Sequence, residues 1–276
     1  MYIALDIGGT NIRIAFKRDL TTNSIDLLKK NNINNCYTKD MEYIINCIKE
    51  NSNGENIKGI SCSVAGTPSQ DRKSFTPRNL SGWLNMPFIL DLENNFHCKI
   101  VMENDTYMSA LGESVYGNNT NHDFLYVTWG TGISFASVKY IDNKTNIYMF
   151  EGGHQIIDWS YNNRLCGCGQ RGCAEAYIGG GNILKYYGKE PKNLSDTEWN
   201  EITDNAAKAI MNAIIFQPSN LIVFGGGIAL NNQNRLEDIK ELISGRLKIV
   251  PVPDIQLTSL GDNVGLLGGF SSFIYK

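Results

Sequence analysis

Asp6-Ile7-Gly8-Gly9-Thr10 joins two segments that read as β-strands, residues 2–7 and 12–17. Glycines in such a turn let backbone N–H groups approach an anion, and a threonine adds a hydroxyl donor. A carboxylate at the strand end can hold Mg²⁺ directly or through water. The dinucleotide-binding fingerprint continues into a helix and does not fit, and no P-loop pattern is present. The hairpin therefore predicts a phosphate site, with an ordinary tight turn as the alternative; its residues are Asp6, Gly8, Gly9, Thr10 and Asn11.

Two further glycine-rich turns follow apolar strands. One is Thr128-Trp129-Gly130-Thr131-Gly132, and the other is Gly225-Gly226-Gly227 after the apolar residues 221–224. Each alone is as typical of a structural turn as of a ligand site, but three such strand ends in one chain favour a bound nucleotide. Residues 9–14 also resemble residues 130–135, and both follow a strand and precede another. This similarity suggests two related domains, with chance similarity of short Gly-Thr turns as the alternative.

Longer helical patterns alternate with these strands, which is typical of an α/β protein. Apolar spacing predicts helices over residues 39–51 and 104–116, and residues 57–64 read as another strand. The capping-box pattern Ser195-Asp196-Thr197-Glu198 predicts a long helix that ends at about Gln217.

The helix predicted at 104–116 begins with a carboxylate that has two possible roles. Glu103-Asn104-Asp105 follows the apolar pair Ile100-Val101, and Asn104 or Asp105 caps the helix. Asp105 is therefore either a helix cap or a general base.

Residues with metal-ligand chemistry cluster in the middle of the chain. Cys166-Gly167-Cys168-Gly169-Gln170-Arg171-Gly172-Cys173, here called the knuckle, has glycines that let the chain fold back around an ion. With His154, its three cysteines fill a tetrahedral shell, which predicts a closed structural Zn²⁺ site; free thiols near a loop are the alternative. His97 and His122 are expected to be surface or core side chains.

Composition narrows the class of protein. The 25 Lys and Arg nearly balance the 28 Asp and Glu, so nucleic acid is not an expected partner. No targeting segment is evident, and no apolar run approaches the roughly 20 residues that span a bilayer. The seven cysteines without a secretory context favour a reducing compartment, so a cytoplasmic protein without a membrane partner is expected.

On these motifs the sequence resembles the ROK family of sugar kinases and repressors over nearly the whole chain. Residues 6–10 and 130–132 match its two phosphate motifs, and residues 225–227 match its adenosine-side glycine turn. Asn104-Asp105 followed by Leu111-Gly112-Glu113 matches its catalytic segment. Glu151-Gly152-Gly153-His154 and residues 166–175 match its zinc and sugar signature, and Asn79-Leu80-Ser81-Gly82-Trp83 resembles the loop that walls its sugar pocket.

The resemblance implies an actin-like, hexokinase-like ATPase fold with two ribonuclease-H-like domains around a cleft. The expected domains are residues 1–107, with the first phosphate hairpin and the catalytic Asp, and residues 108–263, with the second hairpin, the knuckle and the third glycine turn. A C-terminal helix at about 264–276 is expected to pack on the first domain. A homo-oligomer, with a dimer as the expected state, is also implied.

The resemblance further implies an ATP-dependent kinase that transfers the γ-phosphoryl group to a hexose or N-acetylhexosamine, with the 6-hydroxyl as the expected acceptor. Asp105 would be the base, the glycine turns would bind ATP with Mg²⁺, and a structural Zn²⁺ would fix the sugar-binding loop. The implied sugar-binding residues are Asn79, Asn104, Asp105, Glu151, His154 and Glu175.

Departures from the family pattern leave the sugar open. Trp129 replaces a small aliphatic residue, and Tyr107 stands in an altered stretch after the base. The alternatives to a kinase are a sugar-responsive regulator and a non-catalytic sugar-binding protein. ROK repressors carry a helix-turn-helix ahead of the first phosphate motif, which here begins at residue 6, so the kinase is the expected function.

Overall fold

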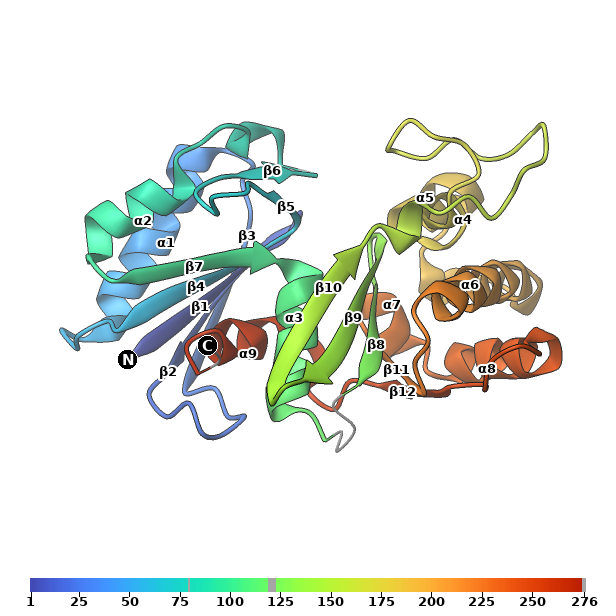
Figure 1. Cartoon of the computed structure of the whole chain (residues 1–276). Helices are drawn as coiled ribbons and strands as arrows, with labels where there is room; N and C mark the ends of the chain where they lie inside the picture. The colour runs from blue at the N-terminus through green and yellow to red at the C-terminus, as the bar shows by residue number, and fades with distance from the viewer. Residues whose placement is uncertain (79, 119–122, 275–276) are drawn as a thin grey trace. The chain divides into compact units, whose positions relative to one another are not determined.

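A computed structural model describes residues 1–78, 80–118 and 123–274, and the chain forms two compact units (Figure 1). The first unit is Met1–Gly117 together with Asn263–Lys276, and the second is Asn118–Asp262. Each unit has helices packed on a five-stranded sheet, so the α/β class predicted from the sequence is confirmed.

The first unit is built on a sheet in the order β3-β2-β1-β4-β7. β1, β2 and β3 are antiparallel neighbours, whereas β1, β4 and β7 run parallel. Alternate residues of β1 face opposite sides: Ile3, Leu5 and Ile7 pack in the cluster that contains the apolar faces of α1 and α2, while Ala4 faces α9. The elements are β1 (Tyr2–Ile7), β2 (Asn11–Lys17), β3 (Leu27–Asn32), α1 (Tyr37–Ser52), β4 (Gly59–Val64), β5 (Gly66–Pro68), β6 (Phe75–Pro77), η1 (Ser81–Trp83), α2 (Phe88–Phe96), β7 (Lys99–Asn104), α3 (Asp105–Tyr116) and α9 (Val264–Ser271).

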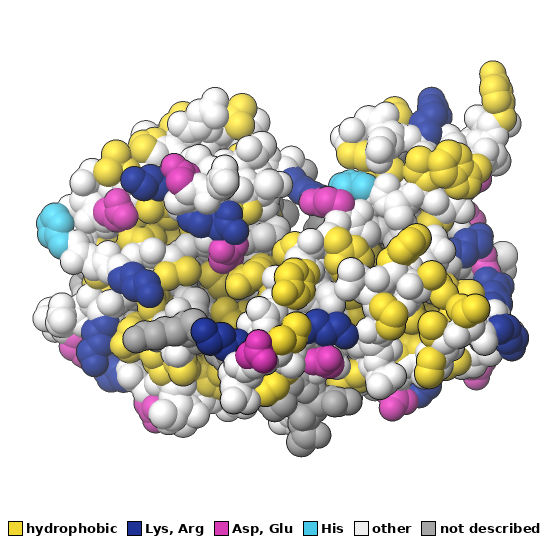
Figure 2. Space-filling view, in the orientation of Figure 1, with side chains coloured by type: hydrophobic (Ala, Val, Ile, Leu, Met, Phe, Trp, Pro, Cys, Tyr) yellow, Lys and Arg dark blue, Asp and Glu magenta, His cyan; other side chains and the backbone are white. Residues whose placement is uncertain are grey.

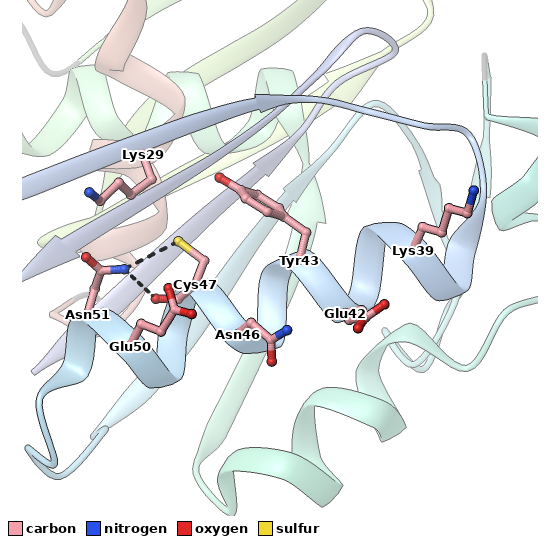
Figure 3. A pocket seen from close by; sticks show the side chains of 8 residues that line it. All are labelled: Lys29, Lys39, Glu42, Tyr43, Asn46, Cys47, Glu50 and Asn51. Carbon is pink, nitrogen blue, oxygen red and sulfur yellow. Dashed lines mark hydrogen bonds between the residues drawn. The ribbon is translucent and has the colours of Figure 1, made fainter.

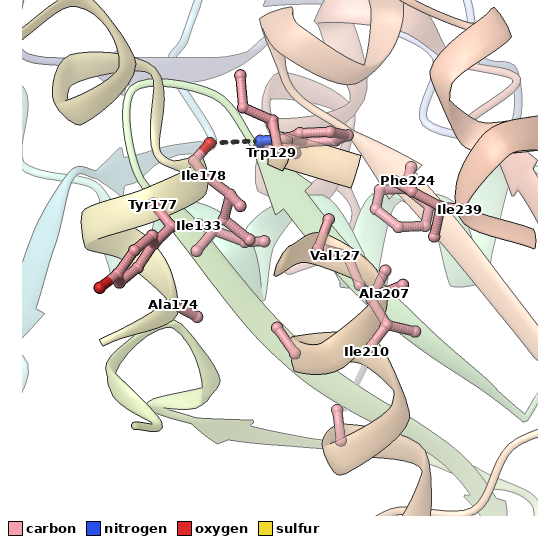
Figure 4. Packing of buried hydrophobic residues seen from close by; sticks show 14 of the residues in the cluster. Val127, Trp129, Ile133, Ala174, Tyr177, Ile178, Ala207, Ile210, Phe224 and Ile239 are labelled. Atoms are coloured by element: carbon pink, nitrogen blue, oxygen red, sulfur yellow. Dashed lines mark hydrogen bonds between the residues drawn. The ribbon is translucent and has the colours of Figure 1, made fainter. Parts of the chain in front are cut away.

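The second unit repeats this plan with the order β10-β9-β8-β11-β12. Its core packs the β-strands against α4, α6 and α8, and Trp129 and Phe224 lie among the aliphatic side chains of these helices (Figure 4). The predicted capping box is confirmed, because Ser195 Oγ accepts from Glu198 N and the Glu198 carboxylate accepts from Ser195 N. The elements are β8 (Phe124–Trp129), β9 (Ile133–Ile141), β10 (Lys144–Phe150), η2 (Gly152–His154), α4 (Ala174–Ile178), α5 (Gly180–Tyr187), η3 (Pro191–Asn193), α6 (Asp196–Phe216), β11 (Leu221–Gly225), α7 (Gly227–Asn231), α8 (Asn234–Arg246), β12 (Asp254–Leu257) and η4 (Gly261–Asn263).

The boundary between the units lies later than the predicted residue 107. That position falls inside α3, and the whole of α3 packs with the first unit as far as Gly117. The reason is a close contact between α3 and α9: a Cβ added at Gly268 would lie 1.6 Å from the Met108 carbonyl oxygen. A helix held this closely along its length cannot be divided between two units. The C-terminal segment groups with the first unit.

Charges of both signs are present on the surface of the molecule. Lys and Arg side chains are interspersed with Asp and Glu over the face seen in Figure 2. Among the described residues, every helix is too short or too polar to cross a membrane.

Candidate functional site

The first glycine turn connects β1 to β2 and is open to solvent within its unit. Gly8 N donates to Asn11 O at 3.0 Å, and Asn11 Nδ2 donates to Thr10 Oγ1 at 2.9 Å. Gly9 and Thr10 are exposed. The turn therefore presents backbone and hydroxyl groups on a short, internally bonded loop, which is a suitable geometry for an anion.

Asp6 stands at the end of β1 and is paired with an arginine that the sequence analysis did not single out. Arg13 is its cross-strand neighbour on β2, and Nε and Nη2 of Arg13 both bond to Asp6 Oδ2, at 2.9 and 2.5 Å. The two side chains are about one-fifth exposed. The hairpin spacing could have revealed the pair, because residues that flank a short turn symmetrically lie opposite each other in the ladder.

Asp105 is the first residue of α3, and Asn104 rather than Asp105 is the N-cap. Asn104 Oδ1 accepts from Thr106 N at 2.8 Å and from Tyr107 N at 3.4 Å, while its Nδ2 donates to Gly66 O at 2.9 Å. The side-chain amide of Asn104 thus caps the start of α3 and bonds it to the first residue of β5. Asn104 is therefore the N-cap, and Thr106 N also donates to Asp105 Oδ1 at 2.8 Å.

The Asp105 carboxyl group is half-buried, and its pKa is raised to about 6. Burial is the main cause, and the negative charge of Asp6 adds to it; the Thr106 N–H and the charge of Arg78 act in the opposite direction. A carboxylate with this pKa is ionised at neutral pH yet binds a proton more readily than an exposed aspartate, which suits a general base.

The second glycine turn, between β8 and β9, is backed by another segment of its own unit. Gly180 N donates to Gly130 O and Gly181 N donates to Thr131 O, both at 2.9 Å. Inside the turn, Gly130 N donates to Gly132 O at 3.0 Å. The start of α5 therefore fixes this turn through its backbone.

The third glycine turn lies beside the second because β11 pairs with β8 in parallel. This register sets Gly225 opposite Thr128. Gly226 has φ 89° and ψ 156°, and a Cβ there would lie 2.5 Å from Trp129 O. Only glycine fits this position without strain. The structure thus brings two of the three predicted phosphate or nucleotide segments together at one edge of the second sheet.

The predicted sugar-binding residues of the second unit gather at the start of β9. Glu175 Oε2 accepts from Ile133 N at 3.3 Å, and a Cβ added at Gly132 would lie 2.5 Å from the same oxygen. Glu151 precedes η2 and His154 is its last residue, and the close fit of Gly153 against Ile133 packs η2 on the same strand. Asn79, the remaining member of the predicted set, lies outside the described residues.

The four predicted metal ligands converge. The ligand atoms of His154, Cys166, Cys168 and Cys173 all lie within 4.8 Å of one another. His154 Nδ1 is 3.7 Å from Cys166 Sγ, and Cys168 Sγ is 3.7 Å from Cys173 Sγ. A tetrahedron with Zn–S bonds of about 2.3 Å has edges of about 3.8 Å, so the residues fit a zinc ion. The other ring nitrogen of His154 faces Glu151, with Nε2 3.8 Å from Oε2.

A separate hollow lies on the surface of the first unit, beside α1 and β3 (Figure 3). Its volume is about 440 Å³, and its lining includes Lys29 and Lys39 as well as Glu42 and Glu50. This mixed lining selects no charge type and includes none of the predicted site residues.

The comparisons assign the chain to a family. The sequence profile of the ROK family matches residues 2–275, and the chain belongs to this family. A glucokinase of Thermotoga maritima is 26% identical over 313 residues, covering 98% of this chain and 96% of that protein. An N-acetyl-D-glucosamine kinase of Yersinia pseudotuberculosis is 24% identical, with 97% of each chain covered. The xylose repressor of Bacillus subtilis is 32% identical over 141 residues, which is 50% of this chain and 36% of the repressor, so the match spans about a third of that protein.

The solved structures confirm the predicted fold. The ROK glucokinase of Streptomyces griseus, determined with glucose and AMPPNP, has a TM-score of 0.79 at 21% identity and covers 98% of both chains. The ROK hexokinase of Thermus thermophilus also has a TM-score of 0.79 at 21% identity, covering 99% of this chain. The chain therefore has the actin-like, hexokinase-like fold of these enzymes.

Proposed function

We propose that the protein is an ATP-dependent sugar kinase that transfers the γ-phosphoryl group to the 6-hydroxyl of a hexose or N-acetylhexosamine. The observation that carries this proposal is the Asp105 carboxylate, which is half-buried and has a raised pKa. Asn104, and not Asp105, is the N-cap of α3. The full-length similarity to a glucokinase and to an N-acetyl-D-glucosamine kinase supports the same substrate class.

In the proposed reaction, Asp105 accepts the proton of the attacking sugar hydroxyl as the new P–O bond forms and the bond between the γ-phosphorus and the bridging oxygen breaks. ADP leaves with the electrons of that bond. The first and second glycine turns bind phosphate oxygens, so catalysis is mainly positioning and charge stabilisation. Asp6 would hold Mg²⁺, which supplies neutralising charge on the phosphates. Arg13 keeps the Asp6 carboxylate oriented at the strand end.

An ADP-release assay over a panel of hexoses and N-acetylhexosamines tests the function. We expect one or a few sugars to give kcat values in the ordinary enzyme range of about 1–10³ s⁻¹. NMR of the product would identify the phosphorylated carbon. Failure of every sugar in the panel to release ADP above the sugar-free rate would contradict the proposal.

The proposal includes a structural Zn²⁺ held by His154, Cys166, Cys168 and Cys173, which have the donor set and spacing for it. Metal binding by such a loop is coupled to folding. Cys168→Ser is therefore expected to lose the zinc and to lower the melting temperature by about 5 °C or more, which corresponds to about 2 kcal/mol in a chain of this size. Elemental analysis of protein purified without chelators that finds no zinc would refute the site.

The sugar is proposed to be read by carboxylates that the zinc loop holds in place. Glu175 lies against Gly132 and Ile133, and Glu151 faces His154. A pocket lined with such carboxylates rejects a sugar that lacks a contacted hydroxyl, because the carboxylate is left without its partner. A deoxy analogue altered away from the acceptor carbon should lose roughly 10²-fold in kcat/KM. Glu175→Gln should reduce this discrimination with its zinc content unchanged; equal discrimination in both proteins would return Glu175 to a structural role.

A sugar-responsive regulator is the second candidate, because the similarity to a xylose repressor covers half of this chain. A regulator of this kind would bind sugar without turning over ATP. Calorimetric sugar binding combined with the absence of ADP release across the panel would favour it over the kinase.

A further inference from the structure

Asp40 is a carboxylate with no role in the proposed reaction, and it is completely buried in the first turn of α1. A buried carboxylate is costly unless donors surround it. Asp40 Oδ1 accepts from Asn34 N at 2.8 Å and from Asn34 Nδ2 at 3.0 Å, and Oδ2 accepts from Cys36 N at 3.2 Å. These bonds tie the segment between β3 and α1 to the helix.

The fourth donor comes from a distant part of the sequence. Trp83 Nε1 donates to Asp40 Oδ2 at 3.0 Å, and both side chains are buried. The Trp83 ring packs edge-on against Tyr37 at 5.2 Å and Phe88 at 5.3 Å between ring centroids. Asp40 therefore accepts a hydrogen bond from the Trp83 side chain, whose other contacts in this cluster are with aromatic rings. These contacts hold η1 in place.

The backbone of the same loop also rests on the β3–α1 segment. Gly82 N donates to Asn35 Oδ1 at 3.0 Å, and Asn35 Nδ2 donates to Ser81 Oγ at 3.3 Å. The contact is tight, since a Cβ added at Gly82 would lie 2.1 Å from Asn35 O. Residues 80–84, here called the η1 loop, thus depend for their position on the segment that Asp40 organises.

Arg78, two residues before the η1 loop, is linked to the proposed base, and the segment that supports the loop is bonded to the first glycine turn. Arg78, just before the loop, donates its N–H to Ala65 O at 3.3 Å and lies near enough to Asp105 to favour the ionised carboxylate. At the other end, Ile33 N donates to Thr10 O at 3.0 Å. Asp40 therefore lies in a set of contacts that runs from the first glycine turn to the η1 loop, which follows Arg78 in the chain.

We propose that Asp40 is a positioning residue for sugar binding, which fixes the η1 loop relative to the first glycine turn through Trp83, Asn34 and Cys36. The inference rests on the proposed kinase function, and the residue acts through the loop without contacting the substrate. Loss of the anchor should weaken sugar binding selectively, because the glycine turn keeps its own bonds between Gly8 and Asn11.

Asp40→Asn is the first test. The new amide group turns a donor toward Cys36 N and Trp83 Nε1, so two buried N–H groups lose their acceptor. We expect the KM for the sugar found in the panel to rise about tenfold or more, while the KM for ATP stays within about twofold. Trp83→Phe, which removes the Nε1 donor and leaves a smaller aromatic ring in the same buried position, should raise the sugar KM about threefold. Because both changes break the same bond, Asp40→Asn should add less in the Trp83→Phe background than in the wild type.

Tyr37→Phe is the matched control. It deletes the 2.5 Å bond from Tyr37 Oη to Asp91 Oδ2 on the same aromatic cluster, without touching the η1 loop backbone. It should lower the melting temperature and leave both KM values unchanged.

Several outcomes would overturn the inference. A folded Asp40→Asn protein with the wild-type sugar KM contradicts it, as does an equal rise of the KM for sugar and for ATP. If Asp40→Asn does not fold, an unchanged sugar KM in Trp83→Phe is decisive against it. Wild-type protein that binds and phosphorylates no sugar contradicts the proposed function and this inference together, whereas an active wild type with insensitive variants contradicts the inference alone.

Discussion

The two units have the same strand order but support their glycine turns differently. In the first unit, an ion pair lies beside the turn after β1: Asp6, near the end of the strand, is paired with Arg13. In the second unit, the equivalent strand β8 carries Thr128 near its end, and the turn is backed by the backbone N–H groups of Gly180 and Gly181. Repetition of a fold therefore does not repeat its chemistry. The first hairpin carries a carboxylate suited to a cation, and the second is suited to holding an anion without charge of its own.

The largest effect is expected at the base, which only the first unit supplies. Asp105→Asn should lower kcat by about 10²–10⁴-fold and leave sugar binding intact, because an amide cannot accept the proton but keeps the shape of the carboxylate. Steady-state kinetics and calorimetric sugar binding measure both. Turnover near the wild-type rate would remove Asp105 from the reaction.

The two strand ends can be compared directly through one alanine substitution in each. Asp6→Ala should lower kcat by roughly 10²-fold at saturating Mg²⁺ and keep sugar binding, because the acid is proposed to hold the cation on the phosphates. Thr128→Ala at the corresponding place of the second unit should cost less than about tenfold. Equal losses in the two variants would mean that the hairpins have equivalent roles.

The glycines of the turns should differ in the free energy of unfolding. Gly226→Ala forces a side chain into φ 89° and against Trp129 O at 2.5 Å, and it should destabilise the protein by about 2 kcal/mol or more. Gly8→Ala places its Cβ 3.5 Å from Asn11 O, an ordinary contact, and should cost less than about 1 kcal/mol. Urea unfolding compares them, and a Gly226→Ala protein as stable as Gly8→Ala would disprove the assigned strain.

The smallest effect is a pH dependence that belongs to the first unit alone. Below a pH of about 6, kcat/KM should fall about tenfold per pH unit as Asp105 takes up a proton. The pKa is higher in the folded than in the unfolded chain, so the ionised carboxylate destabilises the fold above about pH 6, and this cost vanishes below pH 3.8. Asp105→Asn should accordingly melt at a higher temperature than the wild type at pH 8. A flat kcat/KM profile down to pH 5 in folded protein would contradict the assigned base.

Features that depend on neighbouring residues could be predicted from the sequence. The two strands around residues 6–10 and the helix opened by Ser195 and Glu198 are confirmed, because hairpin alternation and capping are decided within a few positions. The knuckle is equally local: Cys166, Cys168 and Cys173 are close in sequence, and the structure brings His154 to them.

Features that depend on distant contacts could not be predicted. Asp40 and Trp83 are 43 positions apart, and nothing near either residue indicates that they bond. The first unit extends to Gly117, beyond the predicted residue 107, because the place of α3 depends on its packing against the distant α9. The choice between Asn104 and Asp105 as the cap required the side-chain direction, which the sequence pattern Glu103-Asn104-Asp105 leaves open.

The buried C-terminal helix has a consequence for the order in which the units can be completed during synthesis. α9 packs on β1, β4 and α3. The first unit therefore consists of two sequence segments, one before and one after the second unit, which is continuous from Asn118 to Asp262. On the ribosome, the second unit emerges ahead of residues 264–271. The first unit, although its strands are made first, must wait with β1 and β4 uncovered on one face until α9 arrives. In nascent chains, the uncovered apolar face of the first unit, which is translated earliest, is thus the main surface for aggregation and for chaperone binding.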